Sequence, residues 1–202
     1  GLVSAGIFFK RVNDIIVDQT LRGYEWNGNV YTTFCQPRNS GNANLLGVEV
    51  AFQRDFGFIA PALKCLGIYA NYTYTYSRVK NFNFEGRENE SGLRMPGSPE
   101  HTANASLFFE KAGFNARLSY NFASAFIDEM GASAFYDRYY DKVNYLDLNI
   151  GYTFGKSFKT TVYAEAVNLL NQPLRYYQGV TSRTMQSEHY GTRFNAGVKI
   201  QL

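Results

Sequence analysis

Long segments in which apolar and polar residues alternate one by one constrain this chain more than any other feature. In residues 66–77 the even positions are leucine, isoleucine, alanine and three tyrosines, whereas the odd positions are mostly glycine, asparagine, threonine and serine. Successive side chains of a β-strand point to opposite faces, so such a segment has one apolar and one polar face. No stretch of the chain offers a comparable stripe at helical spacing.

Seven further segments follow the same rule, and the last is as clear as the first. The eight predicted strands cover residues 3–10, 46–53, 66–77, 102–109, 114–122, 146–154, 158–166 and 190–202. Strands of soluble proteins cluster near about five or six residues. A tilted strand that crosses a bilayer needs about nine to eleven. The lengths therefore favour a membrane protein.

The connections between these strands alternate in length. Short turns are expected near 57–62, 111–113 and 155–157, and long loops at about 18–44, 80–100, 124–142 and 169–189. Short turns at one end and long loops at the other are typical of outer-membrane barrels, whereas a soluble sandwich has no reason to sort its loops in this way. The predicted fold class is all-β, an antiparallel transmembrane β-barrel meander with about eight strands in this chain.

Composition excludes several other classes for these 202 residues. A net charge of +3 is too weak for nucleic-acid binding, and 17% aromatic residues are too many for a disordered chain. No uncharged apolar run approaches the roughly 20 residues of a spanning helix. The two cysteines, Cys35 and Cys65, are expected at opposite ends of the structure, so we predict no disulfide between them.

The sequence contains no motif that indicates covalent chemistry, so we expect no enzyme, no cofactor and no resident metal. His101 and His189 are single histidines beside loops. One loop carries the acidic residues Asp128, Glu129, Asp137 and Asp141, but their spacing is not that of a calcium loop. We interpret this loop as a solvated acidic segment.

Two sets of residues are candidates for contact with a ligand or with the interior of a barrel. A charge that faces lipid is costly, so charged residues on the polar face should face the lumen: Glu49, Arg117, Glu165, Arg193 and Lys199. Loop aromatics can stack on flat ligands, and loop arginines can bind anions. The predicted ligand-binding residues are Tyr24, Trp26, Tyr31, Phe82, Phe84, Arg87, Tyr136, Tyr139, Tyr140, Tyr176, Tyr177 and Arg183.

Several stretches resemble the C-terminal barrel of TonB-dependent outer-membrane receptors. They are NYTYTYS at 71–77, MPGSPEH at 95–101, GFNARLSYN at 113–121 and VYAEAVNLLNQPLRYY at 162–177, followed by a closing strand from Tyr190. The last stretch is the most specific, because alternation alone would fit any barrel. The resemblance covers most of the chain from about Leu45 onward.

This resemblance implies a location, a function and a set of partners. The chain would be the last eight strands of a 22-stranded barrel in the outer membrane of a Gram-negative bacterium, with lipid around it. The plug domain and the segment that contacts TonB would lie outside this chain. The whole receptor would import a scarce nutrient, such as a siderophore–iron complex, cobalamin or an oligosaccharide. The alternatives are a complete eight-stranded barrel with a structural or adhesive role and a soluble β-sandwich binding module.

Overall fold

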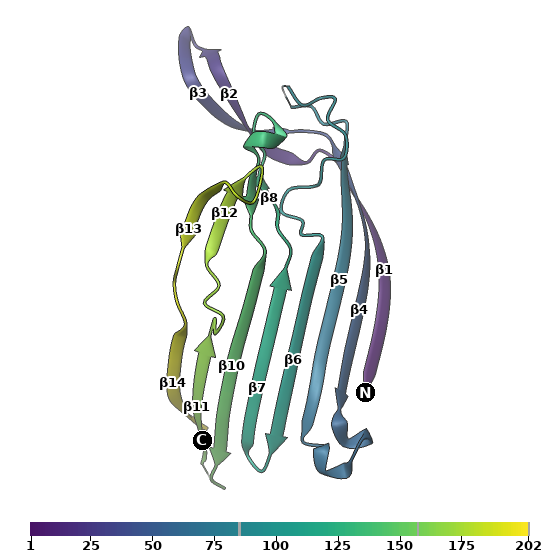
Figure 1. Cartoon of the computed structure of the whole chain (residues 1–202), viewed down its shortest axis with the longest axis vertical. Coiled ribbons are helices and arrows are strands. Elements are labelled where there is room, and N and C mark those ends of the chain that lie inside the picture. Colours follow the sequence, from purple (N-terminus) through teal and green to yellow (C-terminus); the bar gives the residue numbers. More distant parts are fainter. Residues whose placement is uncertain (85, 157, 202) are drawn as a thin grey trace.

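The main body of the protein is one antiparallel sheet of eight long strands, which we call the wall sheet (Figure 1). The computed structural model describes residues 1–84, 86–156 and 158–201, with Thr20 described through its backbone only. In spatial order the strands are β1 (Leu2–Val12), β4 (Asn42–Asp55), β5 (Leu66–Lys80), β6 (His101–Lys111), β7 (Phe114–Ala123), β10 (Val143–Phe154), β11 (Lys159–Val167) and β14 (Arg193–Gln201).

These strands confirm the eight predicted ones, with shifted ends. The last strand begins at Arg193 rather than at residue 190, and the predicted end of that strand, Leu202, lies outside the described residues. The strands pair in a meander in which β1 and β14 are the outer edges. Among the described residues those two edges do not pair with each other, so the sheet is an open part of a barrel.

The wall sheet has one apolar and one polar face, as the alternation predicts. On the apolar face the side chains of Phe194, Val198 and Ile200 are 75%, 62% and 63% exposed, so in the described structure no second layer covers them. On the polar face Arg117, Asn149 and Glu165 follow one another across β7, β10 and β11. The Asn149 amide donates to Glu165 Oε1 over 3.2 Å. This face therefore presents hydrogen-bonding groups across neighbouring strands.

Glycines on the polar face provide space for aromatic rings from the next strand. A Cβ atom at Gly67 or Gly47 would collide with the ring of Phe108 or Phe8, respectively. A Cβ atom at Gly197 would lie 2.6 Å from the hydroxyl oxygen of Tyr163. Glycine within a strand commonly marks such a close approach. The aromatic rings fill the space that the glycines leave, so these glycines do not widen the space in front of the polar face at these points.

The connections are short at one end of the wall sheet and long at the other, as predicted (Figure 1). At the short end, residues Ala112 and Gly113 both have positive φ and reverse the chain in two residues between β6 and β7. The 3₁₀ turns η1 (Phe56–Phe58) and η2 (Pro61–Leu63) join β4 to β5. The turn predicted at 155–157 includes Ser157, which lies outside the described residues.

The first long connection corrects the sequence interpretation, because it is a hairpin and not a loop. Strands β2 (Ile16–Trp26) and β3 (Asn29–Asn39) pair with each other and with no other strand in the described structure. Asn27 and Gly28, with φ of 51° and 76°, form the turn between them. Asn-Gly is the preferred pair for a two-residue turn with positive φ at both positions. That dipeptide was the signal that could have predicted the hairpin.

Two of the three other long connections also contain short strands, whereas the described residues between β5 and β6 form none. Strands β8 (Phe126–Glu129), β9 (Arg138–Tyr140), β12 (Leu174–Gln178) and β13 (Thr184–Glu188) form a second sheet in the order β13-β12-β9-β8, and η3 (Ala134–Tyr136) precedes β9. We call residues 13–41, 81–100, 124–142 and 168–192 the cap. Ile15, Val17, Phe82, Phe84 and Ile127 are buried in one apolar cluster, which joins the cap to the upper ends of β4 and β5. None of the described helices is long and apolar enough to cross a membrane.

Candidate functional site

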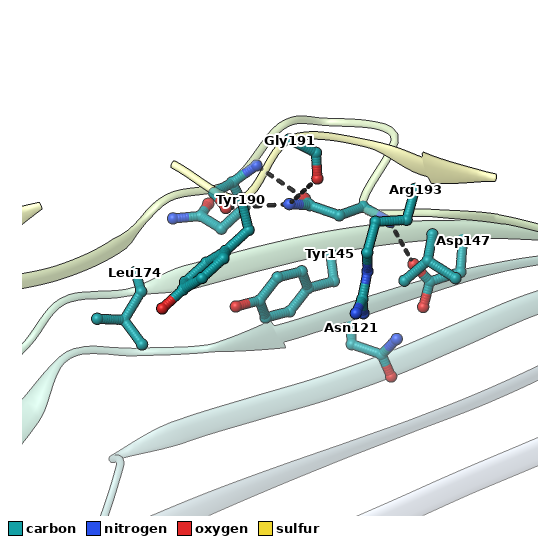
Figure 2. Close-up of a pocket in the computed structure, with 10 residues that line it drawn as sticks. Asn121, Tyr145, Asp147, Leu174, Tyr190, Gly191 and Arg193 are labelled. Carbon is teal, nitrogen blue, oxygen red and sulfur yellow. Dashed lines mark hydrogen bonds between the residues drawn. The ribbon is translucent and has the colours of Figure 1, made fainter. Parts of the chain in front are cut away.

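A pocket of about 490 Å³ lies where the polar face of the wall sheet meets the cap (Figure 2). Asn121 of β7, Tyr145 and Asp147 of β10, Val167 of β11 and Arg193 of β14 form its wall. The chain between β11 and β14 completes it with Asn168, Gln172, Leu174, Tyr190 and Gly191. The volume is within the range of about 300–1,000 Å³ that is usual for small-molecule sites.

The turn that follows β11 is held by the side chain of Asn168. Its amide nitrogen donates to the carbonyl oxygens of Gln172 and Gly191 over 3.1 and 3.3 Å, and its amide oxygen accepts from the Gln172 nitrogen over 2.8 Å. Its backbone nitrogen donates to Asp147 Oδ1 over 2.8 Å. Asn168 has a φ of 60°, a conformation that asparagine adopts more easily than most residues. Asn168 therefore connects β10, β11 and the start of β14 at the edge of the pocket.

Gln172 is fixed in the same way, so its amide is not available to a ligand. Its side-chain oxygen accepts from the Asn144 nitrogen over 3.1 Å, and its side-chain nitrogen donates to Pro173 O over 3.1 Å. The Tyr190 hydroxyl donates to Glu188. These contacts orient the cap side of the pocket.

The wall side of the pocket offers free polar groups. Asp147 Oδ1 accepts from the Asn168 nitrogen, but the second carboxylate oxygen of Asp147, the Asn121 amide and the Arg193 guanidinium have no hydrogen-bond partner among the described residues. Figure 2 shows the side chains of Asn121, Tyr145, Tyr190 and Arg193 pointing into one space. The pocket thus combines two aromatic rings with one donor–acceptor amide, one cation and one anion.

The cap is held together by a buried ion cluster around Arg87. Arg87 and Asp137 are only 2% and 1% exposed. Arg87 Nη1 and Nη2 donate to the two oxygens of Asp137 over 2.5 and 3.0 Å, and Nε and Nη2 donate to Glu90 over 2.5 and 2.8 Å. Nη1 also donates to Gly131 O over 3.0 Å. Burial by itself lowers the pKa of Arg87, but the hydrogen bonds and charges of Glu90 and Asp137 outweigh it and raise the pKa above its usual value.

The acidic residues that the sequence placed in one loop are separately paired with arginines. Arg138 pairs with Asp128 and Glu129, and Arg175 pairs with Asp141 over 2.5 Å. Within the described part of the chain no three His, Cys, Asp or Glu side chains form a candidate metal group. Cys35 and Cys65 are both free thiols, the first on β3 and the second directly before β5.

The predicted ligand-binding residues other than Arg87 lie in three different surroundings: the hairpin, the apolar cluster and the second sheet. Tyr24, Trp26 and Tyr31 gather around Phe34 on the β2–β3 hairpin, with Tyr24 and Phe34 stacked at 4.4 Å between ring centroids. Phe82 and Phe84 are buried and stack at 5.5 Å, so they contribute to the apolar cluster.

The remaining predicted residues belong to the second sheet and its surroundings. Tyr139 and Tyr177 stack at 5.0 Å, and Tyr140 lies against Tyr176 at 5.2 Å. Burial raises the pKa of Tyr140 to about 12. Tyr136 is exposed, and the guanidinium of Arg183 lies 3.7 Å from the ring centroid of Phe135.

Of all the predicted site residues only Arg193 lines the pocket. The registers place Glu49, Arg117, Glu165 and Lys199 on the same polar face as Arg193. Sequence reasoning missed Asn121, Tyr145, Asp147 and Tyr190, because it considered charged residues on strands and aromatic residues in loops. Polar and tyrosine side chains near the upper ends of adjacent strands were the available signal.

Comparisons with known proteins agree with this architecture. A family model described as "TonB dependent receptor-like, beta-barrel" matches residues 1–169. The ferric citrate transporter FecA in its unliganded form is similar in structure with a TM-score of 0.67 and 18% identity, over 98% of this chain and 29% of that one. The outer membrane transporter YddB from Escherichia coli gives a TM-score of 0.56 and 12% identity, over 97% of this chain and 30% of that one. No curated protein sequence matches the chain.

The two structural similarities are of low sequence identity and show the fold alone, and this chain spans less than a third of either transporter. The family model, in contrast, covers most of the chain and includes the wall strands β1 to β11. Together with the open sheet, the two-faced strands and the sorted connections, it shows that this chain belongs to the family of TonB dependent receptor-like β-barrels.

Proposed function

We propose that the chain is part of an outer-membrane transport receptor of a Gram-negative bacterium that takes up a scarce nutrient with energy from TonB. One observation carries this proposal: the apolar face of the wall sheet is exposed, while the polar face holds a ligand-sized pocket beneath a packed cap. An exposed apolar band outside and a polar interior are the arrangement of a barrel in lipid. The nutrient classes under consideration are siderophore–iron complexes, cobalamin and oligosaccharides.

In this proposal the wall sheet is the C-terminal portion of a larger barrel. Strands outside this chain would pair with the free edges of β1 and β14, and would complete a barrel of 22 strands as the family resemblance implies. The share of each structural neighbour that the chain covers supports this, because it is below a third. A plug domain in the lumen and a TonB-contacting segment would also lie outside the chain. Glu49, Arg117, Glu165 and Lys199 would line the lumen beside the plug.

The proposed ligand contacts divide between the pocket and the exposed aromatics. Trp26 and Tyr31 on the hairpin and Tyr136 remain available at the surface of the cap. The Arg183 guanidinium donates to Phe135 O and to Gln178 Oε1, so we propose that it supports this surface. Phe82, Phe84 and Arg87 would act indirectly, by holding the cap in place. The paired rings of Tyr139 and Tyr177, and of Tyr140 and Tyr176, would support the surface in the same way.

Uptake by cells tests the proposed function. The full-length receptor is produced in a Gram-negative host with and without TonB, and accumulation is measured for ferric siderophores, cobalamin and neutral oligosaccharides. We expect accumulation of one class that requires both the receptor and TonB. Equal accumulation without TonB would contradict active transport. A receptor that is monomeric and folded in buffer without detergent would contradict the membrane location.

A further inference from the structure

The free groups of the pocket differ from those expected at a site for an ion. Arg193 contributes one positive charge and Asp147 one negative charge, and both side chains line the same space as the Asn121 amide. A carboxylate on a ligand would be attracted by Arg193 but repelled by Asp147. A cation on a ligand would be attracted by Asp147 but repelled by Arg193. Because the attraction and the repulsion oppose each other, an ion of either sign is favoured less here than in a pocket lined by charges of one sign.

The same groups are well suited to neutral hydroxyls. A hydroxyl donates one hydrogen bond and accepts others. Asp147 can accept through its free oxygen, Arg193 can donate, and Asn121 can do both. The Tyr145 and Tyr190 rings add flat apolar faces, and Tyr190 is held by its hydrogen bond to Glu188. Hydrogen-bonding groups beside aromatic faces complement a molecule with hydroxyls at its rim and C–H groups on its faces.

We infer that this pocket binds a neutral, polyhydroxylated ring of the transported ligand, as in a carbohydrate, and does not bind an anionic chelate. The inference rests on the proposed transport function and names the chemical class that this site selects. Asn168 and Gln172 do not touch the ring. They hold the cap side of the pocket through hydrogen bonds that are already satisfied within the protein.

Asp147→Asn distinguishes the two ligand classes by the sign of its effect. An asparagine still accepts the hydrogen bond from the Asn168 nitrogen through its oxygen, so the turn after β11 keeps its contact. For a neutral ligand the charged acceptor is lost, and affinity should fall about tenfold or more. For an anionic ligand the repulsion is lost, and affinity should rise.

The matched control is Asp55→Asn at the short end of the wall sheet. Asp55 Oδ1 accepts from the Gly57 nitrogen over 2.9 Å, as Asp147 Oδ1 does from Asn168, but Asp55 does not line this pocket. The control therefore removes the same charge while keeping the same kind of backbone contact. It should leave affinity for either class unchanged.

The measurement is calorimetric titration of the full-length receptor in detergent. The probes are di- to tetrasaccharides of glucose, galactose, mannose and xylose in one arm and ferric citrate in the other. We expect a neutral saccharide to bind and Asp147→Asn to weaken its binding. Asn121→Ala, which removes none of the hydrogen bonds of the Asn168 turn, should weaken it about threefold to tenfold. Asn121→Ala keeps the test valid if Asp147→Asn does not fold.

Three results would overturn the inference: no binding by any neutral saccharide, binding that neither pocket variant changes, or ferric citrate binding that Asp147→Asn strengthens. TonB-dependent accumulation in cells is scored separately with the same receptor. TonB-dependent accumulation of an anionic chelate would contradict the inferred ligand class but would agree with the proposed transport function. Accumulation that does not depend on TonB would contradict the proposed transport function instead.

Discussion

The wall sheet and the cap are stabilised in opposite ways. Among the described residues all six ion pairs lie in the cap or next to it, and the main cluster of buried apolar side chains joins the cap to the upper ends of β4 and β5. The wall sheet has its large apolar side chains exposed along one face. The cap thus packs as a water-soluble domain does, whereas the apolar face of the wall sheet is uncovered in the described structure. In the proposed barrel this face would contact the hydrocarbon tails of lipids.

The largest effect is expected from the cap, at Arg87→Ala. This change leaves Asp137 buried without its partner, and breaking a buried pair costs about 3–5 kcal/mol. Hydrogen exchange should accelerate in residues 81–100 and 124–142 but not in the wall strands. Arg94→Ala is the control, because Arg94 pairs with Glu100 at a half-exposed site and the loss should be below about 1 kcal/mol. Equal effects of both variants would mean that the cap has no buried ionic core.

The second prediction compares the two faces of the wall sheet at adjacent positions of β4. Val50→Arg places a charge on the apolar face, and at mid-depth in a bilayer this costs about 2–4 kcal/mol. Glu49→Arg places the same side chain on the polar face and should change stability by less than about 1 kcal/mol. The free energy of unfolding in lipid vesicles is measured by urea titration. Similar costs on both faces would mean that lipid does not surround this sheet.

A somewhat smaller effect is expected where a ring covers a glycine on the polar face. Gly67→Val inserts side-chain atoms into the space of the Phe108 ring and should destabilise the barrel by about 1–3 kcal/mol. Gly6→Val lies on the same face with open space around it and should have little effect. Heat-modified migration on gels reports the folded fraction of each variant. A stable Gly67→Val variant would indicate that the ring is not packed there.

The smallest effect is expected at the tip of the β2–β3 hairpin, the part of the cap that projects away from the apolar cluster (Figure 1). Gly28→Ala forces a Cβ into a φ of 76°, at a cost of about 1–2 kcal/mol. Exchange of the hairpin amides should accelerate while the apolar cluster at the hairpin base stays protected. Asn29→Ala, in the adjoining strand, is the control. Loss of protection at Ile15 and Val17 as well would show that the tip and the base unfold together.

The sequence was sufficient for the wall sheet and insufficient for the cap, for a physical reason. Alternation with a period of two depends only on the faces of a single strand, so the strand around Leu66–Lys80 was predicted within a few residues. The cap strands β8, β9, β12 and β13 are only three to five residues long and pair across distant connections. Periodicity cannot be detected in such short segments. The hairpin was not predicted, although the dipeptide Asn27-Gly28 is typical of a two-residue hairpin turn.

The site was predicted even less completely than the cap. Arg193 was placed on the polar face correctly by its position in the alternation, but no pattern in the sequence connects it with Asn121 or Asp147. Those residues are brought together by three strand pairings in series, from β7 through β10 and β11 to β14. Arg87 was predicted to bind a ligand anion, and the structure gives all five of its donors to protein acceptors.

The amino-acid sequence by itself determined the strands, their two faces and the order of short and long connections, because each depends on neighbours a few residues apart. Only the tertiary structure decided which side chains meet. It buried Phe82, Phe84 and Arg87 in the cap and left the groups of Asn121, Asp147 and Arg193 free in the pocket. Whether a polar group is paired or free depends on contacts between residues far apart in the chain, and these form only when the strands have assembled.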